Sequence, residues 1–527
     1  MAGKGAIACG HPATAAAARE ILDDGGNAFD AALAGLCAAT VAEPVFCSLA
    51  GGGYLLAHRA DGAPQIYDFF VETPRRRRPQ ADIDFTPVLA DFGTATQEFH
   101  IGLGAIATPG VVAGLFAAHT DLGNLPVSRL VEPAVRLARD GVTLRPIDGY
   151  IFQIVGRILT ARPEGRALFM NGERHLLATG DQLHQPDLAA TLEALAAEGP
   201  ALFYEGELGQ RLVADCRAHG GQITDADLAG YEVVKRAPLE GCYRDARILT
   251  NPPPSSGGIL IAFALTLLER IDLGLGGAGS AEHLGALARA MELTNKARVE
   301  SQLHQAMAEN EEEAAAARLF DPALLARYAQ EILPHPCSPR PHSPRGTTHI
   351  SVVDAAGNIA ALSVSNGEGC GYILPGTGIM LNNMLGEEDL SPQGFHVWPK
   401  GCRMSSMMAP TIAFRDDGRI AALGSGGSNR IRTAILQVLI NLIDFGMSAE
   451  EAVSAPRLHI ENQVANLEDG VMEAAAKAAT ALTEQTVRWP AHNLFFGGVH
   501  TVTRDADGRC SGAGDPRRGG AAVIVLD

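Results

Sequence analysis

Residues 346–349, with the sequence Gly-Thr-Thr-His, have the types and the setting that a self-generated nucleophile requires. The run of residues 334–346 contains five prolines, which remove backbone donors and fix φ, so neither a helix nor an interior strand can form there. We therefore expect an exposed, extended linker that ends at Thr347. Cleavage of the Gly346–Thr347 bond would give Thr347 a free α-amine beside its hydroxyl, so one residue would supply nucleophile and general base. An α-amino pKa of ~7.7 to 8 suits a base at neutral pH.

The chain after Thr347 predicts the strand pair that would hold this residue. Residues 349–353 and 359–365 are largely apolar, and a turn sequence ending in Gly-Asn lies between them at residues 355–358. This pattern is typical of a β-hairpin, here with Thr347 at its open end. It also fits a plainer alternative, in which an ordinary interdomain linker runs into a strand and is never cut.

A glycine-rich segment provides a second candidate for chemistry. Residues 424–429 read Gly-Ser-Gly-Gly-Ser-Asn and connect a predicted strand at 419–423 with a predicted helix at 431–445. A connection of this kind points backbone N–H groups toward a negatively charged oxygen, as an oxyanion hole requires. The alternative is a tight turn without a catalytic role.

Helices and strands alternate along the chain, as in layered α/β or α+β proteins. Apolar spacing predicts further helices at residues 13–22, 29–42, 111–119, 127–139, 187–197, 259–270 and 281–308. Further strands are predicted at residues 52–58, 246–249 and 409–414.

The composition agrees with an acidic enzyme and argues against proteins that bind nucleic acid or membranes and against zinc-binding or disulfide-rich scaffolds. A formal net charge of −18 gives no long-range attraction for nucleic acid or anionic membranes. The basic run at residues 75–78 is predicted to be a solvated loop, with attraction of an anionic substrate as the alternative. Nine cysteines without a CxxC pair give neither a zinc framework nor a disulfide scaffold. His335, Cys337 and His342 lie in the proline-rich run without a fixed scaffold, so no metal site is expected.

The first residues contain no continuous apolar segment typical of a secretory signal. This predicts a cytoplasmic location, or a periplasmic one if the true start lies upstream. The longest apolar helix candidate, residues 259–268, is much shorter than the ~20 residues that a bilayer requires, so no membrane span is expected.

From Thr347 onward the chain resembles the small subunit of the γ-glutamyltranspeptidases, and large-subunit motifs of that family precede the linker in order. These are Asp-Gly-Gly-Asn-Ala at 24–28, Gly-Gly-Gly-Tyr at 51–54, Thr-Pro-Gly-Val at 108–111, Glu-Pro-Ala at 132–134 and Asn-Pro-Pro-Pro-Ser-Ser-Gly-Gly at 251–258. Each motif alone is weak, but the ordered set is specific. The resemblance implies an N-terminal-nucleophile (Ntn) hydrolase that cuts itself into residues 1–346 and 347–527. It also implies an α+β fold, a four-layer αββα sandwich in which the two subunits interleave.

The resemblance also implies roles for individual residues. Thr347 would be the nucleophile and Ser365 the second hydroxyl beside it. The main-chain oxyanion donors would be Gly427 and Ser428, or Gly426 and Gly427 in the alternative register. The residues expected to bind the substrate are Ser405 and Ser406, which would hold an α-carboxylate, together with Glu387, Asn366 and Gly426.

The donor pocket departs from the family pattern. The arginine that clamps the substrate carboxylate in the family is absent after residues 67–69, where Phe70 follows. Met384 and Gly367 likewise replace the family's glutamine and asparagine. Glu387 remains to pair with a substrate ammonium, and Arg403 or the basic run at 75–78 could replace the missing clamp. No other side chain presents the fork of an arginine to a carboxylate, so γ-glutamyl recognition depends on such a replacement.

The expected activity is that of a γ-glutamyltransferase or glutathione hydrolase. Thr347 would attack a small γ-glutamyl amide and pass the acyl group to water or an amine, without a metal or organic cofactor. The first alternative is an acylase that acts on glutaryl or other acyl amides. A non-catalytic binding protein on the same scaffold is the second alternative.

Overall fold

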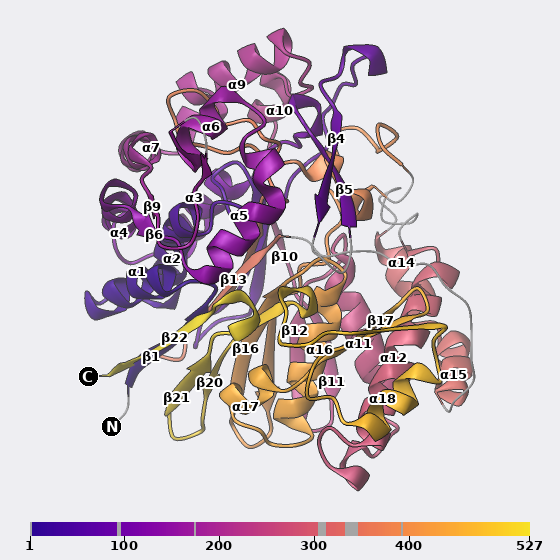
Figure 1. The fold of residues 1–527 in the computed structure, drawn as a ribbon. Helices are drawn as coiled ribbons and strands as arrows, with labels where there is room; N and C mark the ends of the chain where they lie inside the picture. The colour runs from indigo at the N-terminus through magenta and orange to yellow at the C-terminus, as the bar shows by residue number, and fades with distance from the viewer. Residues whose placement is uncertain are drawn as a thin grey trace.

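The computed structural model describes residues 3–91, 96–172, 175–303, 312–332, 346–391 and 394–526. Two antiparallel sheets form its centre (Figure 1). The strand order of the first is β10 (Val234–Arg236), β3 (Gln65–Phe69), β2 (Gly52–His58), β14 (Ile359–Ser365), β13 (Thr348–Asp354), β1 (Gly3–Cys9) and β22 (Ala521–Leu526). The order of the second is β11 (Leu239–Tyr243), β12 (Ala246–Thr250), β15 (Thr411–Arg415), β16 (Ile420–Gly426), β20 (Gly498–Arg504) and β21 (Cys510–Ala513).

The two sheets contact each other, and each also contacts helices. Strand β13 touches β16 and β20 of the second sheet, while β1 touches β20 and β21. The first sheet contacts α1 (Pro12–Asp23), α2 (Ala28–Ala42) and α3 (Val111–Leu122). The second contacts α11 (Ser256–Leu268) and α16 (Arg430–Ile443), and α12 (Ala281–Glu300) packs on α11. The α+β class predicted from the sequence is confirmed.

The remaining elements surround this centre. The helices are α4 (Val127–Asp140), α5 (Pro146–Leu159), α6 (Pro163–Phe169), α7 (Pro186–Glu198), α8 (Ala201–Tyr204), α9 (Glu207–Ala218), α10 (Asp225–Ala229), α14 (Glu312–Leu319), α15 (Pro322–Glu331), α17 (Ala449–Ser454) and α18 (Glu473–Thr480). The strands are β4 (Thr86–Asp91), β5 (Thr96–Ile101), β6 (Val142–Thr143), β7 (Met170–Asn171), β8 (His175–Leu176), β9 (Gln182–Leu183), β17 (Leu458–Glu461), β18 (Val464–Leu467) and β19 (Gln485–Arg488).

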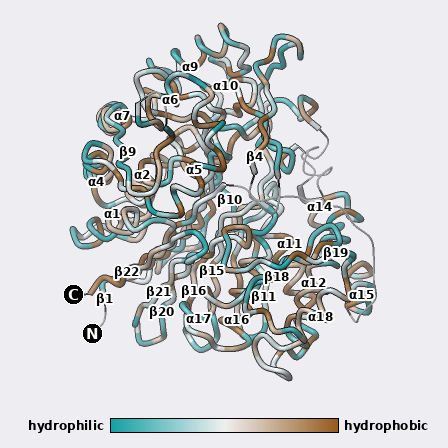
Figure 2. Tube along the Cα trace, viewed as in Figure 1, coloured by the Kyte–Doolittle hydropathy of each residue, from teal (hydrophilic) through white to brown (hydrophobic). Residues whose placement is uncertain are grey.

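Alternating side chains of the central hairpin supply two separate hydrophobic cores. Ile350 and Val352 of β13 belong to the cluster shared with α1 and α2, whereas Val353 belongs to the cluster shared with the second sheet. Both faces of β13 are therefore buried. Figure 2 colours the chain by hydropathy and shows hydrophilic stretches along outer helices such as α4 and α7. His349 also lies between the sheets, where its ring nitrogens contact the hydroxyls of Ser363 and Ser351 at 2.8 Å each.

Most predicted elements agree with the structure, and the disagreements have local causes. Strands β2 and β14 have the predicted bounds. The helix predicted at residues 281–308 ends at Glu300, because Ser301 caps it and Gln302 takes a left-handed φ of 52°. Strand β1 was not predicted: its sequence is rich in glycine and alanine, and it forms by pairing with β13 on one side and β22 on the other.

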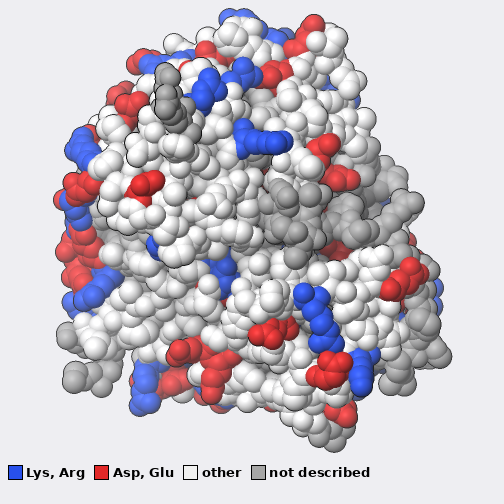
Figure 3. Space-filling view, in the orientation of Figure 1, with Lys and Arg blue, Asp and Glu red and all other residues white. Residues whose placement is uncertain are grey.

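Residues before and after Thr347 contribute strands to both sheets. The proline-rich run up to residue 345, with His335, Cys337 and His342, lies outside the described residues. Within the described ranges no helix has the length and apolar character needed to cross a membrane. On the face drawn in Figure 3, acidic and basic side chains are interspersed, and many of them lie toward the rim.

Candidate active site

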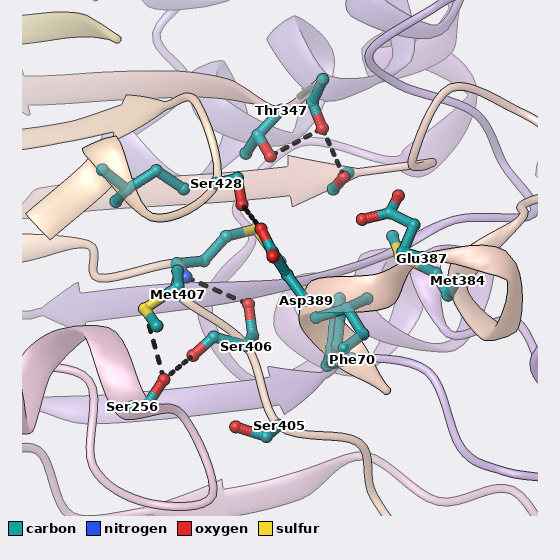
Figure 4. A pocket seen from close by; sticks show the side chains of 15 residues that line it. Phe70, Ser256, Thr347, Met384, Glu387, Asp389, Ser405, Ser406, Met407 and Ser428 are labelled. Atoms are coloured by element: carbon teal, nitrogen blue, oxygen red, sulfur yellow. Dashed lines mark hydrogen bonds between the residues drawn. The ribbon is translucent and has the colours of Figure 1, made fainter. Parts of the chain in front are cut away.

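The central hairpin brings Thr347 and Ser365 together on one carbonyl oxygen. Thr347 directly precedes β13, and Ser365 is the last residue of the neighbouring strand β14. The Thr347 hydroxyl donates a hydrogen bond of 2.7 Å to the carbonyl oxygen of Gly346, and the Ser365 hydroxyl donates one of 2.8 Å to the same oxygen. Figure 4 shows these two bonds at the edge of a pocket. The pairing predicted from the sequence therefore places two hydroxyls at the bond proposed for cleavage.

Strand β16 of the second sheet approaches Thr347 so closely that only glycine fits. A Cβ atom added to Gly426 would lie 1.9 Å from the carbonyl oxygen of Thr347. After Gly426 the chain turns through Gly427 and Ser428, with φ values of 123° and 50°, and helix α16 follows. This segment thus lies beside Thr347, at the amino end of a 14-residue helix whose dipole favours negative charge.

Asp389 holds the side chain of Ser428. The Ser428 hydroxyl donates to Asp389 Oδ2 at 2.5 Å, and both residues line the pocket. In Figure 4, Asp389 lies between Ser428 and Phe70. The carboxylate therefore fixes the left-handed turn that carries the candidate oxyanion donors.

Buried charges hold the residues around Thr347. Arg518 Nη1 donates to the carbonyl oxygen of Thr347 at 3.0 Å. Burial lowers the pKa of Arg518 to about 10, so this guanidinium is still positively charged at neutral pH. Thr348 donates to Glu43 Oε2 at 2.7 Å, and burial raises the pKa of the Glu43 carboxyl. On the other side of Thr347, Gly346 N–H donates to Glu368 Oε1 at 2.7 Å.

The pocket beside Thr347 combines an apolar wall with serines and two acids. Its lining consists of Phe70, Met384, Leu390, Met407, Met408 and Ile431, of Ser256, Ser365, Ser405, Ser406 and Ser428, of Glu387 and Asp389, and of Gly346 and Thr347. Ser406 is fixed in place, because its carbonyl accepts from Ser256 N–H at 2.7 Å and its hydroxyl accepts from Met408 N–H at 3.0 Å. Six predicted site side chains (Thr347, Ser365, Glu387, Ser405, Ser406 and Ser428) therefore share one pocket.

Some predicted binding residues lie elsewhere. Asn366 is fully buried and does not line the pocket, and Gly426 lies beneath Thr347 instead. Arg403 was considered as a replacement for the missing clamp, but its guanidinium faces Asp68 at 3.5 Å and Glu72 at 3.2 Å. It also contacts the Tyr231 hydroxyl at 2.7 Å.

The basic run also lies away from the pocket. Residues 75–78 form a largely exposed loop and none of them lines the pocket, in agreement with the solvated loop predicted first. Neither this run nor Arg403 therefore supplies a carboxylate clamp in this arrangement.

Sequence reasoning assigned no role to four residues around Thr347: Ser256, Glu368, Asp389 and Arg518. Each reaches the site through the fold and not through a local pattern. Ser256 lies within the motif at residues 251–258, Glu368 lies two residues after Asn366 and Asp389 two residues after Glu387, so three of the four are close to residues that the sequence had singled out. The described residues contain no group of three or more His, Cys, Asp or Glu that could hold a metal ion.

The chain belongs to the gamma-glutamyltranspeptidase family, because the sequence model of that family matches residues 14–525. It is 35% identical over 536 residues to the acylase ACY 1 proenzyme of Pseudomonas sp. (strain SE83), with 99% of this chain and 94% of that protein covered. It is 31% identical over 522 residues to the glutathione hydrolase proenzyme of Escherichia coli (strain K12), with 94% and 88% covered. The family consists of Ntn hydrolases and transpeptidases made as proenzymes, so this chain is an enzyme of that class.

Solved structures agree with this membership. The cephalosporin acylase from Bacillus halodurans superposes with a TM-score of 0.85 at 23% identity, over 99% of this chain and 96% of that chain. At this identity the match concerns the fold alone. The gamma-glutamyltranspeptidase of Helicobacter pylori gives a TM-score of 0.55 at 27% identity, over 62% of this chain and 92% of that chain.

Proposed function

We propose that this chain is an αββα Ntn hydrolase that cuts its own Gly346–Thr347 bond and then uses Thr347 to cleave an amide. The observation that carries the proposal is the hydrogen bond of 2.7 Å from the Thr347 hydroxyl to the carbonyl oxygen of Gly346. It places the nucleophile beside the group that it must attack in the uncut chain. Cleavage would leave residues 1–346 and 347–527 as large and small subunits and would free the α-amine of Thr347.

In the cut enzyme the same residues would perform acyl transfer. Thr347 Oγ attacks the substrate carbonyl carbon, and its own α-amine accepts the hydroxyl proton and returns it to the leaving amine. The N–H groups of Gly427 and Ser428 would donate to the developing oxyanion, which the amino end of α16 would also favour. The ester on Thr347 is then released by water or by an acceptor amine. Ser365 remains within reach of the reacting oxygen and directs the proton.

The pocket favours an acyl group without a carboxylate. Six of its described lining residues are apolar, two are acids, and none is Lys or Arg. A glutaryl carboxylate would meet Glu387 and Asp389 without a described cation to pair with it, which costs desolvation and repulsion. We therefore propose an acylase that acts on neutral, largely apolar acyl amides.

A γ-glutamyl donor is the second candidate. Glu387 and Asp389 could pair with its α-ammonium, while Ser405 and Ser406 would offer hydroxyls to its α-carboxylate. Two serine hydroxyls hold a carboxylate more weakly than an arginine fork does. This candidate is also supported by the glutathione hydrolase relative from Escherichia coli.

Three p-nitroanilides at matched concentration test these proposals: hexanoyl, γ-glutamyl and glutaryl. We expect the order of kcat/KM to be hexanoyl, then γ-glutamyl, then glutaryl, and we expect the uncut Thr347→Ala variant to be inactive on all three. The fastest turnover of the γ-glutamyl anilide would favour the second candidate. Equal activity of Thr347→Ala, or a single uncut chain in the wild type, would contradict the mechanism.

A further inference from the structure

Glu368 contacts the residue that precedes the proposed cleavage site, and no step of the acyl-transfer mechanism uses it. It follows β14, in a turn where Gly367 and Gly369 have φ values of 63° and 82°. Its side chain is buried, with 3% of the residue exposed. Its backbone N–H donates to Asn383 Oδ1 at 2.9 Å, which fixes the residue independently of its carboxylate.

The carboxylate of Glu368 holds one end of Gly346 while two hydroxyls hold the other end. Glu368 Oε1 accepts the Gly346 N–H at 2.7 Å. The Gly346 carbonyl oxygen accepts from Thr347 Oγ1 at 2.7 Å and from Ser365 Oγ at 2.8 Å. The backbone of Gly346 is therefore fixed at both its donor and its acceptor, with the carbonyl turned toward the Thr347 hydroxyl.

A second charged residue holds the far side of the same bond. Arg518 Nη1 donates to the carbonyl oxygen of Thr347 at 3.0 Å. The Gly346–Thr347 pair is thus held at both ends: the buried Glu368 carboxylate accepts from Gly346 N–H, and the buried Arg518 guanidinium donates to the Thr347 carbonyl oxygen. Hydrogen bonds that involve a charged partner are shorter and stronger than neutral ones, so this arrangement limits changes in the φ and ψ angles of the two residues.

Self-cleavage makes strict demands on that geometry. Thr347 Oγ must reach the carbonyl carbon of Gly346, where a C–O bond forms as the C–N bond breaks and the hydroxyl proton passes to the freed nitrogen. Water then hydrolyses the ester, which releases the Gly346 carboxylate and restores the Thr347 hydroxyl beside a free amine. A misplacement of about 1 Å between reacting groups can cost about a hundredfold in rate.

We propose that Glu368 is a positioning residue for maturation, which holds the Gly346 N–H so that the carbonyl of Gly346 stays in front of Thr347 Oγ. This inference rests on the proposed function, because it assumes that the chain cuts itself at this bond. It assigns Glu368 to the formation of the nucleophile. The acceptor oxygen is what matters, so an amide oxygen at the same place would serve.

The test compares self-cleavage of the wild type, Glu368→Ala and Glu368→Gln. Protein synthesis is stopped, samples of the full chain are denatured at timed intervals, and their masses give the fraction that is still uncut. We expect the half-time to lengthen at least about tenfold in Glu368→Ala, because the buried Gly346 N–H loses its acceptor. Glu368→Gln should stay within about threefold of wild type, because its amide oxygen still accepts the Gly346 N–H. Unchanged cleavage of Glu368→Ala, or failure of Glu368→Gln to restore the rate, would overturn the proposal.

A separate control experiment measures folding in variants that cannot cut themselves. Thr347→Ala and Thr347→Ala/Glu368→Ala are compared by thermal unfolding, and we expect both to unfold cooperatively above the temperature of the cleavage assay. If the double variant were already unfolded there, slow cleavage would reflect lost structure and the positioning role would be refuted. If the wild type itself stays uncut, the proposed function fails as well, which separates that result from a failure that concerns Glu368 alone.

Discussion

Replacing Gly346 by alanine tests whether the space around the proposed cleavage site is as tight as the structure shows. An added Cβ would lie 2.8 Å from the carbonyl oxygen of Gly367 and 2.9 Å from Phe46 Cδ1, both shorter than side chains normally tolerate. The Phe46 ring can turn away, but the peptide that carries the Gly367 carbonyl is held by a hydrogen bond of 2.9 Å from Glu368 N–H to Asn383 Oδ1. Gly346 itself must therefore move, which carries its carbonyl away from Thr347.

The expected magnitude follows from the cost of restoring the original geometry. Inserting a methyl group into a packed site costs about 1–3 kcal/mol. The variant must regain the wild-type arrangement in order to react, so this energy adds to the barrier of cleavage. At 1.36 kcal/mol for each factor of ten, Gly346→Ala should cut itself about 5- to 150-fold more slowly than the wild type.

The assay is the fraction of uncut chain with time, measured by denatured mass. Gly241→Ala is the matched control, because Gly241 lies in β11 and an added Cβ there meets nothing within 4 Å. We expect Gly241→Ala to cut at the wild-type rate. If Gly346→Ala were as fast as this control, the close packing around the cleavage site could not be what positions the Gly346 carbonyl.

Two further predictions concern buried polar groups. Ser365→Ala should slow self-cleavage by about two- to tenfold, since it removes one neutral hydrogen bond to the Gly346 carbonyl; Ser365→Thr keeps the hydroxyl and should restore the rate in the same mass assay. Burial lowers the pKa of His500 from its ordinary 6.5 to about 4, so the unfolded chain binds more protons between these values. The free energy of unfolding of uncut Thr347→Ala should therefore fall as the pH drops from 6.5 toward 4 and be less sensitive above 6.5. Urea titrations at pH 7.5 and 5.5 measure this, and equal midpoints would contradict it.

Local sequence patterns predicted the hairpin that carries Thr347 and Ser365. Two strands joined by a Gly-Asn turn lie within 20 residues of each other, and the short connection fixes their register. The hydroxyls of Thr347 and Ser365 are therefore brought together by short-range structure. The glycine-rich segment was also found, but the reason for Gly426 was not. It is glycine because β16 passes against the Thr347 carbonyl, which is a contact between two sheets.

Contacts between distant segments could not be predicted from the sequence. Arg518 reaches Thr347 across 171 positions. Asp389 and Ser428 are 39 positions apart and meet only because the two sheets bring their loops to one pocket. Arg403 lay at a suitable place in the sequence for a carboxylate clamp, yet Asp68 and Glu72 hold it away from the pocket. The direction of a long side chain depends on partners that a linear pattern does not show.

The strand order of the first sheet affects how the protein would unfold after the proposed cleavage. Strand β1 lies between β13 and β22, so a strand from before Thr347 is paired on both sides with strands from after it. If the chain is cut as proposed, separating the two polypeptides would break both of these ladders, and the polypeptides would then have to meet again by diffusion. Unfolding of the cut enzyme would thus be a dissociation, so its refolding should depend on concentration, whereas that of the uncut precursor should not. Persistence of the cut enzyme at low concentration would therefore depend on slow unfolding, whereas the uncut precursor should refold as a single chain.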